Sequence, residues 1–327
     1  MINLFESDEF SMQNMTESIN TLPVTPNRVG ELGLFVEQGI TTTTVGIEMV
    51  NGELRLIKAA PRGTMPESKS HARRSLRALG VPHLPKTDTV LADEVQGVRD
   101  FGTDDQLEAL TQIINQRLEV LKAEHELTWE WHRVGALQGQ IKDGDATTVL
   151  VDLFDFFGVV RITVNWAKSD AQGLKKACMS IIRQIGVELK GGASRGVHVF
   201  CGSQFWEDLV TSTETRAAFE LQESNAYARD QTFQQFVYAG VTFEPLHGMV
   251  GSTPFVPVNE ASAFPLAPIY KRFNAPAPMS SAVNTLGKPL YALQEPLKFE
   301  QGTEIYTNSN PLHVCTFPRT LIRVTMS

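Results

Sequence analysis

One amphipathic stripe dominates the pattern of apolar and polar positions along this chain of 327 residues. Thr103 with Gln106 three positions later forms a capping box at its start. Apolar side chains then recur every three or four positions, in the order Leu107, Leu110, Ile114, Leu118 and Leu121, followed on the same face by His125, Trp129 and His132. The pattern predicts one helix over residues 103–138, about 50 Å long at about 1.5 Å per residue.

Polar residues define the other side of this predicted helix. Glu119, Lys122 and Glu126 lie three or four positions apart, as do Glu130 and Arg133, which is the spacing of solvated pairs on a helix surface. We therefore expect this face to be exposed. Helices of this length are typical of coiled coils, membrane spans or elongated domains. Because the stripe leaves a strict heptad in its later part and the segment is too charged for lipid, the pattern favours an elongated domain.

The chain before this helix has the pattern of extended segments. Residues 1–30 lack apolar periodicity, which predicts an extended arm that is disordered on its own, so we expect a neighbouring copy to hold it. Residues 40–50 and 53–60 alternate like strands around Asn51-Gly52, which predicts a β-hairpin. Since an isolated hairpin is marginally stable in water, we expect this one to lie on another copy as well.

Beyond the long helix, the pattern predicts a mixed α/β unit and a β-rich tail. A hairpin of residues 137–141 and 147–151 and an apolar β-rich run at 153–164 come directly after the helix. The mixed unit follows at about 169–279, with a helix at 169–189, a buried strand at 197–201, short helices at 204–210 and 214–221, and strands at 233–243 and 265–270. The tail comprises strands at 291–293, 304–307, 312–317 and 321–324. We expect the tail strands to join the sheet of residues 137–164, which makes the unit between them an insertion.

Composition restricts the class of protein. Its length of 327 residues corresponds to about two domains, and 42% apolar residues are enough to form a hydrophobic core in each. The net charge of -8 argues against a protein that binds nucleic acid over much of its surface. The odd number of widely spaced cysteines, Cys178, Cys201 and Cys315, indicates reduced thiols and assembly in a reducing cytoplasm. No apolar run reaches the roughly 18 residues of a membrane span, and the acidic first twenty residues do not resemble a signal peptide.

Charge is segregated into a basic tract at 55–77, with seven basic residues against one acidic, and an acidic tract at 88–108, with seven acidic residues against one basic. We expect the basic tract to dock on the acidic entry to the long helix of an adjacent subunit, where matched charge would guide association. The residues assigned to this contact are Arg55, Lys58, Arg62, Lys69, Arg73, Arg74 and Arg77 on one side and Asp93, Glu94, Asp100, Asp104, Asp105 and Glu108 on the other.

The sequence contains no complete motif for catalysis, cofactor binding or metal binding. The glycine-rich run at 191–196 lacks the Lys-Ser/Thr end of a phosphate-binding loop and follows a helix. His125 and His132 share one helix face, but the residues three positions before them are not the glutamates of a bundle metal site. Asp143 and Asp145 fit a turn and lack the remaining ligands of a calcium loop. We therefore assign no catalytic residue, no cofactor and no metal.

The order of elements resembles a tailed-phage major capsid protein of the Hong Kong 97-like fold, and is most similar to the lambda-type capsid family. Two stretches add to this resemblance: residues 195–206, a strand turning into a helix, and residues 311–324, the closing strands. The resemblance implies an α+β fold with an N-terminal arm at 1–37, an extended loop at 38–76, a peripheral domain at 77–167 with its spine helix at 103–138, an axial domain at 168–282, and C-terminal strands at 283–327 that complete the peripheral domain.

The same resemblance implies a structural role and a set of partners. Copies of the chain would form hexamers and pentamers of an icosahedral shell, in a virion assembled in the host cytoplasm, and would enclose double-stranded DNA without sequence-specific binding. It also implies a separate scaffolding protein and a portal. A decoration protein is an optional further partner in such shells. Three alternatives stay in view: an encapsulin-like nanocompartment shell, a DNA-binding protein using the basic tract at 55–77, and an enzyme with a pocket in the 168–282 domain.

Overall fold

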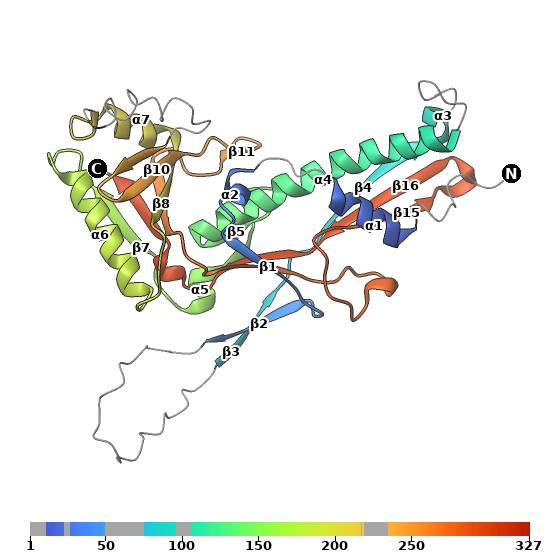
Figure 1. Cartoon of the computed structure of the whole chain (residues 1–327), viewed down its shortest axis with the longest axis horizontal. Coiled ribbons are helices and arrows are strands. Elements are labelled where there is room, and N and C mark those ends of the chain that lie inside the picture. Colours follow the sequence, from blue (N-terminus) through green and yellow to red (C-terminus); the bar gives the residue numbers. More distant parts are fainter. Residues whose placement is uncertain (1–10, 23–26, 50–74, 96–105, 217, 219–234) are drawn as a thin grey trace, which may run out of the picture. The chain divides into compact units, whose positions relative to one another are not determined.

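The computed structural model describes residues 11–22, 27–49, 75–95, 106–216, 218 and 235–327 (Figure 1). The chain divides into two compact units, each built from three separate segments. The first unit comprises Met1–Val45, Gly80–His132 and Lys271–His313, and the second comprises Gly46–Leu79, Arg133–Tyr270 and Val314–Ser327. Both units therefore combine segments that are far apart in the sequence. The five-part division implied by the resemblance stays a prediction.

The predicted long helix is confirmed as α4 (Gln106–Gln138), a helix of 33 residues. Its predicted capping residue, Thr103, lies outside the described residues. In the first unit the apolar stripe of α4 is buried, since the exposed fraction of Ile114 is 1% and that of Leu121 is 2%. The three-to-four-residue spacing therefore identified the core-facing side of this helix correctly.

A three-stranded antiparallel sheet forms the other side of this core. The strands are ordered β15 (Tyr291–Pro296), β16 (Gly302–Ser309) and β4 (Leu84–Leu91), and Figure 1 shows α4 running alongside them. Inward side chains from each strand meet the stripe of α4 in one hydrophobic cluster, including Val90, Ala292 and Ile305. The short helix α3 (Ala92–Val95) follows β4, and the 3₁₀ turn η4 (Lys298–Glu300) joins β15 to β16.

The N-terminal segment packs on the same core. Helix α1 (Met12–Thr21) begins after Ser11, whose Oγ accepts a hydrogen bond from the amide of Asn14 at 3.4 Å. Met15 and Ile19, four positions apart on one face, are 2% and 0% exposed and belong to the cluster around α4. The prediction of an extended arm held by a neighbouring copy is therefore wrong for these residues. Two buried positions were too few to give a visible periodicity in the sequence.

Several further helices and strands are short. Helix α2 (Arg28–Glu31) precedes a three-stranded sheet in the order β1, β14, β17, and η3 (Ser280–Ala282) lies between β14 and β15. Strand β2 pairs with β3, whereas the predicted turn at Asn51-Gly52 and the strand expected at 53–60 lie outside the described residues. The bounds of these strands are β1 (Phe35–Gly39), β2 (Thr44–Met49), β3 (Ser75–Gly80), β14 (Tyr270–Asn274) and β17 (Pro311–Cys315).

The second unit is built around a mixed six-stranded sheet. Its strands lie in the order β7 (Ile162–Trp166), β18 (Ile322–Met326), β13 (Glu260–Pro265), β8 (Val197–Cys201), β10 (Val241–Pro245) and β9 (Phe236–Tyr238). Every residue of β8 is buried, as expected for a continuous apolar strand. Helices α6 (Gly173–Glu188) and α7 (Ser203–Thr211) confirm the helices predicted at 169–189 and 204–210. The helix predicted at 214–221 lies mostly outside the described residues.

In the region after α4, one helix forms where the apolar pattern predicts a strand. The predicted hairpin is confirmed as β5 (Gln140–Lys142) and β6 (Val149–Asp152). The β-rich run expected at 153–164 is wrong at its start, because α5 (Leu153–Phe157) occupies it. The carboxylate of Asp152 caps this helix by accepting hydrogen bonds from the amides of Phe154 and Asp155. A small hairpin, β11 (Met249–Val250) and β12 (Thr253–Pro254), completes the unit with η5 (Pro318–Thr320).

All four strands predicted in the tail are present, but their partners differ from the expectation. Strand β15 pairs with β16, β16 pairs with β4, and β17 lies beside β14. Only β18 joins a strand of the 137–164 region, where it pairs in parallel with β7. The strand expected at 265–270 is wrong as well, because β13 ends at Pro265 and β14 begins at Tyr270. Local patterns located the tail strands, whereas long-range pairing decided which sheet each one joined.

Candidate assembly surfaces

Most of the face of α4 that was predicted to be solvated is buried in the first unit. Lys122, Glu126 and Glu130, which we call the polar row, lie four residues apart on this helix, and their exposed fractions are 5%, 2% and 3%. The prediction of an exposed face is therefore wrong for these three residues, whereas Glu119 on the predicted face is exposed. The physical reason is that the N-terminal segment of the same chain covers the row with its main chain.

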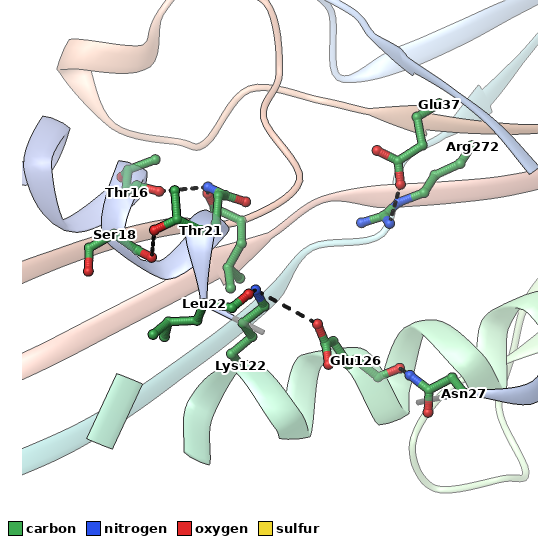
Figure 2. A network of polar contacts seen from close by, with 11 residues as sticks. Thr16, Ser18, Thr21, Leu22, Asn27, Glu37, Lys122, Glu126 and Arg272 are labelled. Atoms are coloured by element: carbon green, nitrogen blue, oxygen red, sulfur yellow. Dashed lines mark hydrogen bonds and ion pairs between the residues drawn. The ribbon is translucent and has the colours of Figure 1, made fainter. Parts of the chain in front are cut away.

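The polar row binds main-chain groups of this N-terminal segment. The ammonium of Lys122 donates to the carbonyl of Leu22 at 2.5 Å and lies 4.0 Å from the carboxylate of Glu126, as Figure 2 shows. The carboxylate of Glu130 accepts from the amides of Val29 at 2.5 Å and Gly30 at 3.2 Å, at the start of α2. Charged partners strengthen such bonds, and each buried charge here is compensated by a polar group.

Helix α1 covers the edge of the sheet in the first unit. The hydroxyl of Thr16 accepts from the amide of Ala292 at 3.1 Å and donates to its carbonyl at 3.2 Å. The side-chain amide of Asn20 donates to the carbonyl of Leu290 at 2.9 Å. Since β15 is an edge strand, these side chains satisfy main-chain groups that another chain could otherwise bind.

A buried arginine fixes the next part of the N-terminal segment. Arg272 of β14 is 2% exposed, and its guanidinium lies 4.0 Å from the ring centre of Trp129. It donates to Glu37 of β1 at 2.7 Å, a pair that Figure 2 also shows, and to the side-chain oxygen of Asn274 at 3.1 Å. The ion pair and the stacked ring together join β1, β14 and α4 within the first unit.

Glu130→Gln provides a test of the contact between the polar row and α2. Loss of the charge and of one acceptor should weaken two buried amide hydrogen bonds, at a cost of about 1–3 kcal/mol. Urea unfolding measures the cost, and faster hydrogen exchange at Val29 and Gly30 would locate it. Glu119→Gln on the exposed side of α4 is the matched control, because surface changes of this kind stay within about 0.5 kcal/mol. Equal effects at Glu130 and Glu119 would contradict the assignment.

His125 is buried on α4 against Thr307 of β16, and it should make the stability of the protein sensitive to acid. Burial lowers the pKa of His125 from 6.5 to about 4, and the imidazole lies 3.0 Å from the hydroxyl of Thr307. Between these pH values the unfolded chain binds a proton that the native chain does not. Stability is therefore full above about pH 6.5 and falls by up to about 3 kcal/mol as the pH decreases to about 4. In denaturant titrations from pH 7.5 to 4.5, His125→Gln should show a shallower dependence, and an unchanged dependence would refute this assignment.

Most of the residues assigned to the charge-guided contact are not described. Arg55, Lys58, Arg62, Lys69, Arg73 and Arg74, together with Asp100, Asp104 and Asp105, lie outside the described residues, and Glu108 is described only as part of α4. Arg77 and Asp93 are exposed, and Arg77 donates to the carbonyl of Phe156 in its own chain. The structure therefore brings none of the described basic residues together with the described acidic ones, and the contact stays a prediction.

Glu94, the last member of this set, already has a partner in its own chain. Its carboxylate lies 2.8 Å from the guanidinium of Arg117 on α4, and Asp88 lies 3.7 Å from the same group. The hydrogen bond that Arg117 donates to Glu94 and the charge of Asp88 raise the pKa of Arg117 above its usual value. Part of the acidic tract is therefore neutralised within the chain. The spacing in the sequence could not show this, because Arg117 lies outside both tracts.

The described residues offer little chemistry for catalysis or metal binding. They contain no group of three or more His, Cys, Asp or Glu side chains that could hold a metal ion. The carboxylate of Asp145 accepts hydrogen bonds from Thr147 and Thr148 of its own turn, which lower its pKa. Burial raises the pKa of the Cys178 and Cys315 thiols to about 12, so that these cysteines are poor nucleophiles. None of the helices in the described ranges is long and apolar enough to cross a membrane.

Comparison with known proteins gives the class to which this fold belongs. Two solved structures match nearly the whole chain: a protein described as a prophage capsid protein from E. coli CFT073 (TM-score 0.57, 12% identity, 97% of this chain and 99% of that one), and the satellite phage P4 procapsid including its size determination protein (TM-score 0.50, 10% identity, 97% and 98%). At this identity the matches show a shared fold. The fold is that of capsid proteins.

The sequence comparisons identify the family. The model of the family described as "Phage major capsid protein E" matches residues 11–326, so the chain belongs to this family and is a capsid protein of the phage virion. The major capsid protein of Salmonella phage Felix O1 (isolate Felix O1-VT1) is 22% identical, over 99% of this chain and 98% of the relative. That of Pseudomonas phage KPP10 is 24% identical, over 97% of each. Membership favours the capsid interpretation over the nanocompartment, DNA-binding and enzyme alternatives.

Proposed function

We propose that this protein adopts the Hong Kong 97-like fold and forms the hexamers and pentamers of an icosahedral, double-stranded DNA-containing head of a tailed phage. The observation that carries the proposal is the family match over residues 11–326, because it covers both compact units. The long helix α4 packed on an antiparallel sheet, and a second unit built on a mixed sheet, agree with the spine, peripheral domain and axial domain of that fold. In this proposal the protein is structural and has no enzymatic activity.

The test of this proposal is assembly. The chain, expressed alone and with the products of neighbouring genes, should form closed shells of uniform diameter that are visible by negative-stain electron microscopy. Particles with five-fold and six-fold capsomers would agree with the proposal. A chain that stays monomeric under every condition, including co-expression, would contradict it.

We further propose that assembly uses a separate scaffolding protein and a portal, with a decoration protein as an additional candidate. The P4 procapsid, to which this chain is structurally similar, includes a size determination protein, which supports an accessory protein that sets particle size here as well. Copies that contact one another through small, repeated surfaces do not by themselves select one shell diameter. Omission of the scaffolding protein from a co-expression experiment should give particles of mixed size, whereas uniform particles without it would argue against a separate scaffold.

We retain the charge-guided contact between the tracts at 55–77 and 88–108 of adjacent subunits as part of this proposal. Exposed ion pairs contribute only about 0–1 kcal/mol each, so the expected effect is on the rate and register of assembly. The Arg73→Glu/Arg74→Glu variant should assemble more slowly, and Asp104→Lys/Asp105→Lys in the same chain should partly restore the rate. Light scattering at low ionic strength would measure both. Normal assembly of the first variant at low salt would contradict the contact.

A further inference from the structure

The turn between β15 and β16 presents a strained and exposed aromatic side chain. Phe299 is 89% exposed, and its backbone has φ 63° and ψ 25°, a left-handed conformation that costs a residue other than glycine about 1–2 kcal/mol. Glycine or asparagine would fit this position with less strain. A single exposed apolar residue is ordinary on a protein surface. Phe299, however, also adopts a strained backbone conformation, and its exposed side chain buries no surface within its own subunit that would offset this cost in free energy.

The backbone around Phe299 is firmly held, so this turn forms a fixed surface that we call the tip. The amide of Leu297 donates to the carbonyl of Gly302 at 2.9 Å, and the amide of Ala92 donates to the carbonyl of Gln301 at 2.9 Å. Leu91 lies opposite Gly302 in the register, which offers it no side chain to pack on, and it is 44% exposed. The tip therefore comprises Phe299 and Leu91, with the exposed carboxylates of Asp93 and Glu295 and the exposed ammonium of Lys298 nearby.

A second exposed apolar surface lies at the other end of β15 in the same unit. Val283 and Leu286 are 60% and 67% exposed, and we call this surface the root. Its segment is also fixed, because the amide of Gly287 donates to the carbonyl of Ile40 at 2.9 Å and a side chain at Gly287 would clash with the main chain of Asn274. Lys288 is the charged residue of the segment from 276 to 290 and is exposed.

We propose that the tip of one copy docks on the root of a second copy of this chain, with Phe299 as the aromatic anchor. The six residues of β15 separate the two surfaces by about 20 Å, so they cannot meet within one chain. Their net charges are opposite, since two carboxylates and one lysine flank the tip and a single lysine flanks the root. A contact between two different surfaces of identical copies runs head to tail and closes into rings when the rotation allows it. The inference rests on the proposed shell, because only an assembly of many copies supplies the second chain.

Cysteine cross-linking of assembled particles tests this contact. The Phe299→Cys/Leu286→Cys variant, treated with a short bismaleimide, should give a ladder of covalently linked chains on a denaturing gel, whereas either single variant should stay unlinked. The native cysteines should not interfere, because all three are buried. Linked dimers from Phe299→Cys alone would overturn the inference, since the tip would then meet another tip. Intact particles without a ladder would also overturn it and leave the shell proposal standing, whereas a wild-type chain that forms no particles would overturn both.

Phe299→Gly separates a role in assembly from a role in folding. Glycine relieves the left-handed backbone, so the isolated subunit should unfold at the same or a higher temperature, while the rate of particle formation should fall by roughly tenfold or more for a loss of an interface anchor. Lys190→Gly is the matched control, because Lys190 is exposed and also has a positive φ, of 49°, but belongs to the second unit. Assembly of Phe299→Gly at the wild-type rate would refute the anchor role.

Discussion

Replacement of Lys122 by Ala should destabilise the protein by about 3–5 kcal/mol, although the sequence pattern placed this residue on a solvated face. The lysine is 5% exposed, and its loss would remove the ammonium that lies 4.0 Å from the buried carboxylate of Glu126. The carbonyl of Leu22 would lose its donor at the same time. Denaturant unfolding of the subunit would measure the change in free energy. Increased protease sensitivity in the N-terminal segment would show where the structure opens.

Two further variants test whether this destabilisation comes from leaving one buried charge without its partner. Lys122→Met/Glu126→Met removes both charges together, and it should cost less than Lys122→Ala, because a buried pair replaced by apolar groups leaves no unpaired charge. Lys86→Ala removes the partner of Glu124 from an ion pair of 3.0 Å in which both side chains are about half exposed, and it should cost at most about 1 kcal/mol. If Lys122→Ala were as mild as Lys86→Ala, the N-terminal segment would not cover the polar row in solution.

Truncation of Ile114 to Ala should cost about 2–5 kcal/mol, because it opens a cavity where α4, α1 and the sheet of β15, β16 and β4 share one cluster. Ile114 is 1% exposed, so the neighbouring side chains have little freedom to fill the space. Thermal or chemical unfolding of the subunit would measure the loss. Leu127→Ala on the same helix is the control, since Leu127 is 51% exposed and its truncation should cost a few tenths of a kcal/mol. Similar values at the two positions would contradict the assignment of the core face.

The sequence predicted best those features that depend on neighbouring residues. The stripe from Ile114 to Leu121 identified α4 and its buried face, and the apolar run at Val197–Cys201 identified a fully buried strand. In both cases a single element determines the periodicity, so no knowledge of its partner is required. The exception, α5, formed where Asp152 supplied a helix cap inside an apolar run, which is a local signal that the periodicity concealed.

The features that the sequence did not predict depend on contacts between distant segments. Lys122 and Glu130 have the spacing of surface pairs, and they become buried because residues about 100 positions earlier lie over them. The pairing of β16 with β4 was missed for the same reason, since β4 precedes β16 by more than 200 residues. The tip was missed as well, because the left-handed backbone of Phe299 leaves no mark on the pattern of apolar residues.

The first unit combines three distant segments of the chain, and this determines when it can fold during synthesis. The side chains of α1 need the main chain of Leu290 and Ala292, and β4 needs β16, which ends at Ser309. These partners leave the ribosome only when almost the entire chain has been made. Until then Met15, Ile19 and the stripe of α4 are without the surfaces that bury them, which is a state prone to aggregation. The core of the first unit therefore closes only after β16 has been synthesised.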